Sequence, residues 1–147
     1  MAELIVVIVI VGILAAVAGP KIQGILGAQD DAWRDQAVAA LRQGQKTAVA
    51  SRRLVCAVVT TGSITLAIAA ANPASTCSAV VTGPDGSATV TNTRSTAATS
   101  VSPQATLYFQ PTGQVSTDGA GAAVANFTVS IATESSISVV GATGYVH

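Results

Sequence analysis

The chain begins with an uninterrupted apolar run, and its pattern changes twice after that. Leu4–Ala18 carries no charge, and a single carboxylate, Glu3, stands directly before it. From Asp30 the small and apolar residues recur at three- and four-residue steps, which predicts an amphipathic helix. After Arg53 the apolar positions follow a period of two, which is typical of strands. We therefore expect a long helix, apolar in its first half and amphipathic in its second, followed by a β-rich part.

The predicted buried face of the amphipathic half is narrow and consists mostly of small residues. Its members are Trp33, Ala37, Ala40, Leu41, Gly44 and Ala48, and the charged residues off this stripe are Asp31, Asp35, Arg42 and Lys46. A face of small side chains lets a flat partner come close, and a sheet is such a partner. An unbroken helix from Glu3 to Arg53 would measure about 75 Å at 1.5 Å per residue. Because this exceeds a bilayer, the second half should be the spine of a globular head.

About seven short strands with frequent turns are expected after residue 53. Two pairs of expected strands are joined by turns: Leu54–Val59 and Ser63–Ala69 by Thr60–Gly62, and Ser78–Thr82 and Ser87–Thr91 by Gly83–Gly86. Two more expected strands, Val124–Thr133 and Ser136–Val140, follow each other near the end of the chain. Thr106–Gln110 is a further strand, Asp118–Gly121 a further turn, and residues 92–105 a long surface loop. Many short strands with tight turns favour antiparallel sheets in two layers.

The expected fold class is therefore α+β, with a long N-terminal helix packed on a small antiparallel β-sandwich-like head. Residues 1–29 form an apolar helix suited to a membrane or to a filament core. Residues 30–147 form the head, with helix over 30–53 and strands over 54–147.

Glu3 needs a positively charged partner if it lies in an apolar layer. A secretory signal peptide has a basic segment before its apolar run, whereas the first cation here, Lys21, follows it. An unpaired acid within lipid costs roughly 3 kcal/mol. The only cation on this side of the run is the α-amino group of Met1, and in a helix Glu3 stands too close to its own amino group to pair well. The amino terminus of a neighbouring copy is therefore the natural partner.

Charge and composition exclude several partners and activities. Seven basic and seven acidic residues give zero net charge, so we expect no binding of nucleic acid. Ten of the fourteen charged residues lie at or before Arg53, which leaves only four for the β-rich part. The only histidine, His147, is the last residue and is expected to be a frayed end. We therefore expect no enzyme, no metal site and no cofactor.

Several smaller features have ordinary interpretations. Asp30 and Asp31 are expected to cap the head part of the helix. Arg52 and Arg53 complement the dipole at the helix end.

The two cysteines, Cys56 and Cys77, are too few for a zinc site without histidines. If the apolar helix places the head outside the cytoplasm, a disulfide between them is expected, worth about 3 kcal/mol for a loop of this length. Two unpaired buried thiols are the alternative.

The first 22 residues resemble the N-terminal motif of type IV pilins and of the pseudopilins of type II secretion. The matching positions of ELIVVIVIVGILAAVAGPK are Glu3, Gly12, Leu14, Ala15, Ala16 and Pro20. A weaker resemblance, to H-type pseudopilins and MSHA-type minor pilins, covers WRDQAVAALRQGQKTAVASRRLVCAVV, the second cysteine, LYFQPTG and TGYV. In the family the acid is normally the fifth residue of the mature chain, and here it is the third. We expect a mature form or one whose first residues differ from the natural start, with methylation at the amino terminus.

The resemblance implies a structural subunit that waits in the bacterial inner membrane as a single-pass protein. Pilus assembly machinery then moves it into an extracellular helical filament, a fimbrium. Glu3 would pair with the amino group of Met1 of an adjacent copy. Gly12, Gly19 and Pro20 would let Gly12–Pro20 lose its helix in the filament, although Pro20 could equally be a simple kink.

Two alternative functions stay open from the sequence. The first is a minor pilin or pseudopilin that primes or caps a filament, with roles in secretion or cell adhesion. The second is a membrane-anchored binding module that never polymerises, a class that has no use for Glu3.

Overall fold

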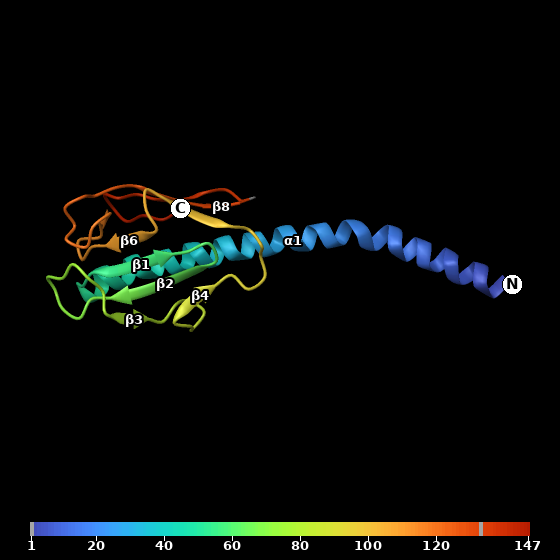
Figure 1. The fold of residues 1–147 in the computed structure, drawn as a ribbon, viewed down its shortest axis with the longest axis horizontal. Helices are drawn as coiled ribbons and strands as arrows, with labels where there is room; N and C mark the ends of the chain where they lie inside the picture. Colours follow the sequence, from blue (N-terminus) through green and yellow to red (C-terminus); the bar gives the residue numbers. More distant parts are fainter. Residues whose placement is uncertain (1, 133) are drawn as a thin grey trace.

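The computed structural model consists of one long helix and nine short strands in the part of the chain that it describes. Residues 2–132 and 134–147 are described, with the backbone alone for residue 2 and residues 17–26. The elements are α1 (Ala2–Ser51), β1 (Val55–Val59), β2 (Ser63–Ile68), β3 (Ala79–Val81), β4 (Thr89–Thr91), β5 (Thr99–Ser102), β6 (Thr106–Phe109), β7 (Val115–Ser116), β8 (Phe127–Ile131) and β9 (Ile137–Val139). Figure 1 shows α1 as a single curved helix whose first half projects away from the head.

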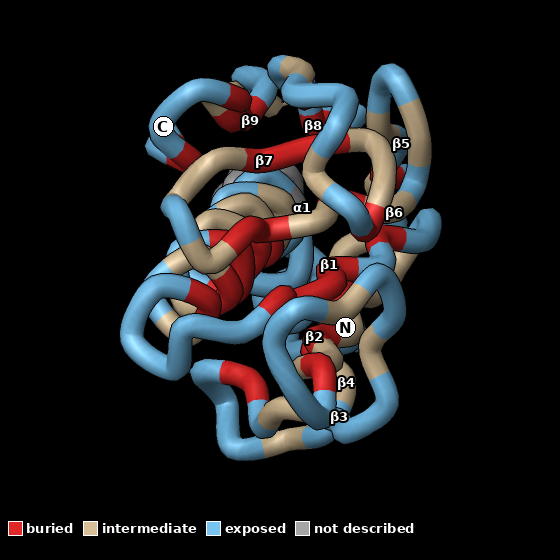
Figure 2. The backbone as a smooth tube through the Cα atoms, turned by 90° about the vertical axis from the view of Figure 1, so that its left-hand side faces the viewer, coloured by how far each residue is buried: buried red, intermediate tan, exposed pale blue. Residues whose placement is uncertain are grey.

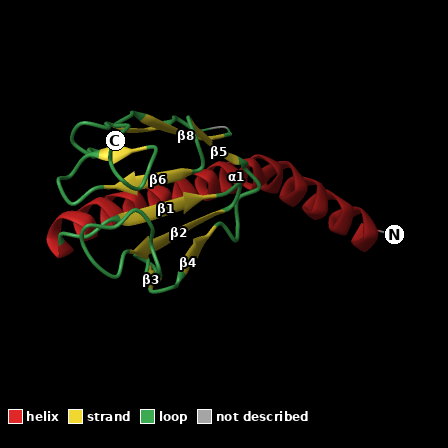
Figure 3. Cartoon of the chain, turned by 60° about the vertical axis from the view of Figure 1, so that its left-hand side comes forward, coloured by secondary structure: helices red, strands yellow, loops and turns green. Residues whose placement is uncertain are grey.

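The strands form two antiparallel sheets. The larger has the order β3-β2-β1-β6-β7, with β4 also paired to β2, and the smaller has the order β5-β8-β9. Figure 3 shows the strands of both sheets lying along the second half of α1. The predicted α+β class, with a long helix on an antiparallel head, is confirmed.

The helix contacts the larger sheet through the predicted stripe of small residues. Trp33, Ala37, Ala40, Leu41 and Ala48 are all at most 2% exposed. A Cβ added to Gly44 would lie only 3.2 Å from Leu66 and 3.3 Å from Phe109, so the helix backbone and sheet side chains are in close contact. Both sheets contribute side chains to this one core, which includes Phe109 and Phe127. Figure 2, in which the chain is seen from one end, shows buried segments of the strands around α1.

The C-terminal end of α1 has a cap that the sequence does not predict, because a non-glycine residue occupies its left-handed position. Arg52 has a left-handed backbone with φ of 52°. The N–H of Arg53 donates to the carbonyl of Ala48 at 3.2 Å, and that of Arg52 to Val49 at 3.3 Å. This pattern is a Schellman-type cap, usually built on glycine, and it turns the chain directly into β1.

Residues 92–105 are not one loop as expected, because β5 lies within them and pairs with β8. The turn expected at Gly83–Gly86 is present, with the N–H of Gly86 donating to the carbonyl of Gly83 at 3.0 Å. The strands before and after this turn both pair with the same edge of β2, β3 with Leu66–Ile68 and β4 with Ser63–Thr65. The short β7 was not expected at all.

Asp30 and Asp31 are also misassigned by the sequence analysis. They lie in the interior of α1, which is continuous from residue 2 to residue 51, so they cap no helix.

The expected strand Val124–Thr133 is shorter than predicted, with β8 beginning at Phe127. Its last residue, Thr133, lies outside the described residues.

We predict that enlarging one residue of the buried stripe destabilises the head, whereas enlarging its exposed neighbour does not. Ala40 is fully buried and Ala39 is exposed. Overpacking a filled core costs roughly 1–3 kcal/mol, so Ala40→Leu should lower the unfolding free energy by about that amount. Ala39→Leu should change it by less than about 0.5 kcal/mol. Denaturant unfolding of the full-length chain in detergent measures both, and equal effects would contradict the packing described.

Candidate assembly surface

Residues 4–16 of α1 expose an apolar surface on all sides of the helix. Every residue from 3 to 16 is exposed, and the large apolar side chains of this stretch, Leu4–Val11, Ile13 and Leu14, are 51–69% exposed. A helix that is apolar all round is normally buried in lipid or among other helices. Contiguous apolar surface on this scale marks an interaction site. Among the helix residues whose side chains are described, no stretch is both long and apolar enough to cross a membrane.

Glu3 lies exposed in the first turn of this helix. A carboxylate there interacts favourably with the positive end of the helix dipole, worth roughly 0.3–1 kcal/mol. That interaction is smaller than the cost of an unpaired acid in lipid, roughly 3 kcal/mol. The amino group of Met1, the partner expected from the sequence, lies outside the described residues. The pairing between copies therefore stays a prediction.

Gly12, Gly19 and Pro20 all lie within the continuous backbone of α1. A Cβ added to Gly12 would meet no atom within 4 Å, so this glycine makes room for nothing within the chain. The interruption of the helix between Gly12 and Pro20, which the resemblance implies for a filament, is absent in the single chain. Its occurrence in an assembly stays a prediction.

Cys56 and Cys77 form a disulfide, with their Cα atoms 6.1 Å apart. The bond joins β1 to the loop that leads into β3, as predicted, and the alternative of two unpaired thiols is wrong. Cys56 belongs to a small cluster on the far face of the larger sheet, together with Leu54 and Ala69. The disulfide therefore holds a long loop against a part of the head that has little apolar core of its own.

Trp33 ties the helix to the smaller sheet. Its indole Nε1–H donates to Oγ1 of Thr99 at 2.8 Å, and both residues are buried. One turn earlier, the hydroxyl of Ser95 donates to the carboxylate of Asp30. The segment that the sequence analysis took for a surface loop is thus fastened to α1 where the helix leaves the head. Sequence reasoning missed this contact because its partners are 66 positions apart.

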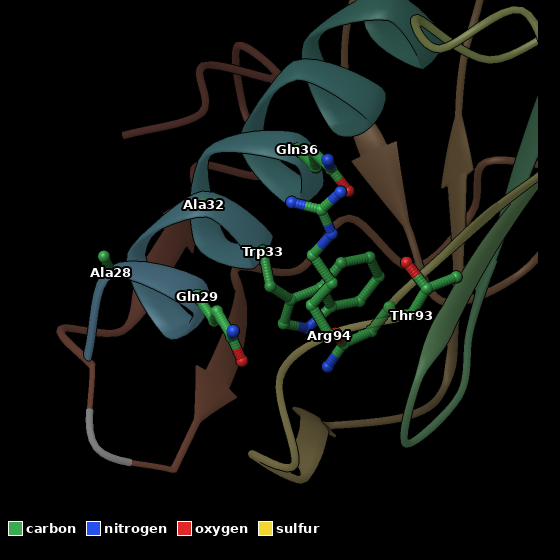
Figure 4. Close-up of a pocket in the computed structure, with 8 residues that line it drawn as sticks. Ala28, Gln29, Ala32, Trp33, Gln36, Thr93 and Arg94 are labelled. Atoms are coloured by element: carbon green, nitrogen blue, oxygen red, sulfur yellow. The ribbon is translucent and has the colours of Figure 1, made fainter. Parts of the chain in front are cut away.

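A polar cleft of about 620 Å³ opens at the same junction. It is lined by Ala28, Gln29, Ala32, Trp33, Gln36 and residues 92–94. Figure 4 shows Gln29, Trp33 and Gln36 extending from α1, with the side chain of Arg94 drawn across Trp33 and Thr93 lying to the right of both. One aromatic ring, three amides, one hydroxyl and one guanidinium can bind polar groups, but they form no nucleophile–base pair. In the described part of the chain, no group of three or more His, Cys, Asp or Glu side chains could hold a metal.

The C-terminal residue is not frayed, contrary to expectation. The backbone N–H and C=O of His147 exchange two hydrogen bonds with Ser138, at 3.0 and 2.7 Å. Its ring stacks on Tyr145, with centroids 5.2 Å apart. Arg42 fastens the same tail, because its Nε and Nη2 both donate to the carbonyl of Val146, at 3.1 and 3.0 Å.

Three carboxylates gather where α1 meets the loop after β8. Partial burial, and then the hydrogen bond and charge of Asp31, raise the pKa of Glu134, and the charge of Asp30 adds to this. Arg34 opposes the shift, and its Nε also donates to the carbonyl of Ser135 at 2.9 Å. This end of the head therefore carries an excess of negative charge.

We predict that the bond between Trp33 and Thr99 fixes the junction of helix and head. Trp33→Phe removes the donor and leaves a buried hydroxyl with a lost partner, which costs about 1–3 kcal/mol. Thr99→Val should cost a similar amount, and the double variant should cost clearly less than the sum. Denaturant unfolding of the three variants checks this, and strictly additive effects would show that the two side chains do not act together.

Comparisons with known proteins give the fold. No family model and no curated protein match this chain. Two crystal structures of the type IV minor pilin FimU of Pseudomonas aeruginosa, strain PAO1, are similar to it. One is 16% identical and covers 80% of this chain and 90% of the FimU chain; the other is 14% identical and covers 85% and 88%. Both superpose with a TM-score of 0.53. The chain therefore has the fold of a type IV minor pilin.

Proposed function

We propose that this protein is a structural subunit of a type IV pilus-like filament, held together by the apolar half of its helix. The observation that carries the proposal is the exposed, wholly apolar surface of residues 4–14 on a helix whose second half is packed in the head. The N-terminal motif and the pilin fold support the same interpretation.

Before assembly, the apolar run Leu4–Ala18 would hold the chain in the bacterial inner membrane. Lipid buries apolar side chains, and a helix satisfies all its backbone hydrogen bonds there. Assembly machinery would then exchange lipid for the helices of other copies in an extracellular filament. The partners of this chain are thus the membrane, the machinery and other copies.

Glu3 would decide how the copies align. In the filament core a carboxylate without a cation would be costly, and the amino terminus of a neighbour supplies one. A membrane-anchored binding module that never polymerises has no need of this acid. The polymerising subunit is therefore the better explanation.

A minor pilin or pseudopilin that primes or caps a filament is the second candidate. It is favoured by the fact that both similar structures are described as minor pilins. Labelling this chain along native filaments separates the two. A major subunit repeats along the whole length, whereas a minor one is confined to an end or to rare positions. Absence from every filament would contradict both.

We predict that Glu3 is needed for assembly and not for folding of the head. Glu3→Ala would leave the neighbour's buried amino group without a partner, a loss of about 3–5 kcal/mol, and filament yield should fall to near background. Glu3→Asp, which keeps the charge, should retain part of the yield. The unfolding midpoint of the head should stay the same in both variants. Normal filaments from Glu3→Ala would contradict the role given to this residue.

We also predict that Gly12–Pro20 is extended in the filament, although it is helical in the single chain. Each glycine costs a helix about 1 kcal/mol relative to alanine, and proline about 3 kcal/mol. A triple variant, Gly12→Ala, Gly19→Ala and Pro20→Ala, should therefore give filaments that lengthen less under load, with Gly27→Ala as the control. A filament map with continuous helix from Leu4 to Arg53 would refute the extension and leave Pro20 as a kink.

A further inference from the structure

The polar cleft at the junction of α1 and the head holds one positive charge and no negative one. Its lining includes the amides of Gln29 and Gln36 from α1, and Asn92, Thr93 and Arg94 from the loop between β4 and β5. Of the described residues that line it, none carries a carboxylate. A guanidinium offers only hydrogen-bond donors, and each amide adds two more. The cleft therefore suits an anion that has several acceptor oxygens.

The guanidinium of Arg94 forms no hydrogen bond or ion pair with any other described residue. Arg34 and Arg42, by contrast, both donate to carbonyls of the head. Arg94 is exposed, and Figure 4 shows its side chain drawn across Trp33. A guanidinium binds carboxylates and phosphates strongly, often through two N–H groups at once. Arg94 can therefore bind such a group from outside the chain.

The loop that carries Arg94 is fastened on both sides of this residue. The backbone N–H of Asn92 donates to the carbonyl of Gly62 at 2.8 Å, and Oδ1 of Asn92 accepts from the N–H of Ser95 at 2.9 Å. The hydroxyl of Ser95 donates in turn to the carboxylate of Asp30 on α1. The backbone of Arg94 is thus held in place before any ligand binds, which lowers the entropic cost of binding.

The cleft lies at the end of the head from which the apolar half of α1 projects. Figure 1 shows the loop after β4 passing α1 at this end. A bilayer has a hydrocarbon core of about 30 Å and measures about 40–45 Å with its headgroups. At 1.5 Å per residue, a helix that enters the core just after Glu3 leaves it at about residue 23 and clears the headgroup layer at about residue 28. The cleft begins at Ala28, so the long side chain of Arg94 would lie within reach of the lipid phosphates.

We propose that this cleft binds the phosphate of a phospholipid headgroup, in the leaflet on the head's side of the membrane. Arg94 pairs with the phosphate, and the amides of Gln29 and Gln36 donate to its remaining oxygens. The inference rests on the proposed function, because it applies to the stage at which the chain waits in the inner membrane. It adds a lipid as a partner and a site for that lipid. The bound headgroup fixes the height and the orientation of the head on the membrane surface before assembly.

Charges on the other side of α1 favour a zwitterionic lipid over an anionic one. Asp31 stands two positions after Gln29, which places it about 200° around the helix, and it lies beside Glu134. The carboxylates on this side repel a bilayer surface that is purely anionic. A zwitterionic surface, such as that of phosphatidylethanolamine, offers phosphates to Arg94 and ammonium groups to the carboxylates.

Trp33 allows binding to be followed without a label, because it is the only tryptophan of the chain and lines the cleft. The full-length chain in micelles of an uncharged maltoside detergent is titrated with dioleoylphosphatidylethanolamine, and native mass spectrometry counts the bound lipids. Dioleoylglycerol, which has the same acyl chains and no phosphate, is the control for binding to the apolar helix. We expect a saturable change in Trp33 emission and one retained lipid with the phospholipid, and neither with dioleoylglycerol.

Three variants locate the binding. Arg94→Gln should weaken it about tenfold or more, because hydrogen bonds between two charged groups are lost. Gln36→Glu should also weaken it, since the new carboxylate repels the phosphate and competes for Arg94. Arg53→Gln removes the same charge from an exposed arginine at the opposite end of the head and should leave binding unchanged. The unfolding midpoint of the head should be the same in Arg94→Gln as in the unaltered chain.

Each possible failure has a distinct meaning. Equal binding of the phospholipid by Arg94→Gln and by the unaltered chain would overturn the site. Binding of inorganic phosphate or of glycerophosphoethanolamine as tight as that of the lipid would overturn the lipid as the ligand. Tighter binding of phosphatidylglycerol than of phosphatidylethanolamine would overturn the preference for a zwitterionic headgroup. The proposed function is tested separately, by flotation of the unaltered chain with vesicles and by its presence in filaments. A chain that floats and enters filaments but binds no phospholipid at the cleft would overturn this inference alone.

Discussion

The close approach of α1 to the larger sheet is the contact on which the whole head depends. Ala37, Ala40, Gly44 and Ala48 contribute almost no bulk, so the sheet can supply the large side chains. Leu66 and Phe109 lie so close to Gly44 that they leave little room even for a Cβ there. This arrangement lets strands from both sheets share one core around a single helix. It also explains why so few aromatic residues, 3% of the chain, suffice.

The core begins at Trp33, and none of the side chains described before it, those of residues 3–16 and 27–32, belongs to that core. The exposed apolar residues at the start of α1 are therefore left to bind elsewhere. Trp33 and Thr99 define the boundary, and the bond between Asp30 and Ser95 reinforces it on the side facing the exposed half. A chain that must transfer its apolar half from one environment to another benefits from such a boundary, since changes beyond it need not disturb the packed core.

Sequence reasoning identified what local patterns encode. The stripe from Trp33 to Ala48 follows from helical periodicity, and β1, β2 and β6 follow from runs of β-branched and aromatic residues. It failed where a distant partner decides. Thr99 looks like a loop residue until Trp33 buries it, and a turn at Gly83–Gly86 does not reveal that both its arms pair with β2. The same limit applies to the candidate site. The N-terminal motif identifies Glu3 and Gly12, whereas the proposed partner of Glu3 belongs to another molecule.

The two kinds of surface on α1 would have different tasks in an assembly. Burial of apolar side chains is strong but non-directional, so the first half alone would hold copies together at many displacements. Charges fix alignment, since a wrong displacement places like charges together. Most charged residues of this chain lie between the N-terminus and Arg53, whereas strands β1, β2, β3, β4 and β6 contain none. In the proposed filament, the register between copies is thus specified by the helix, and the sheets are free to form a neutral outer surface.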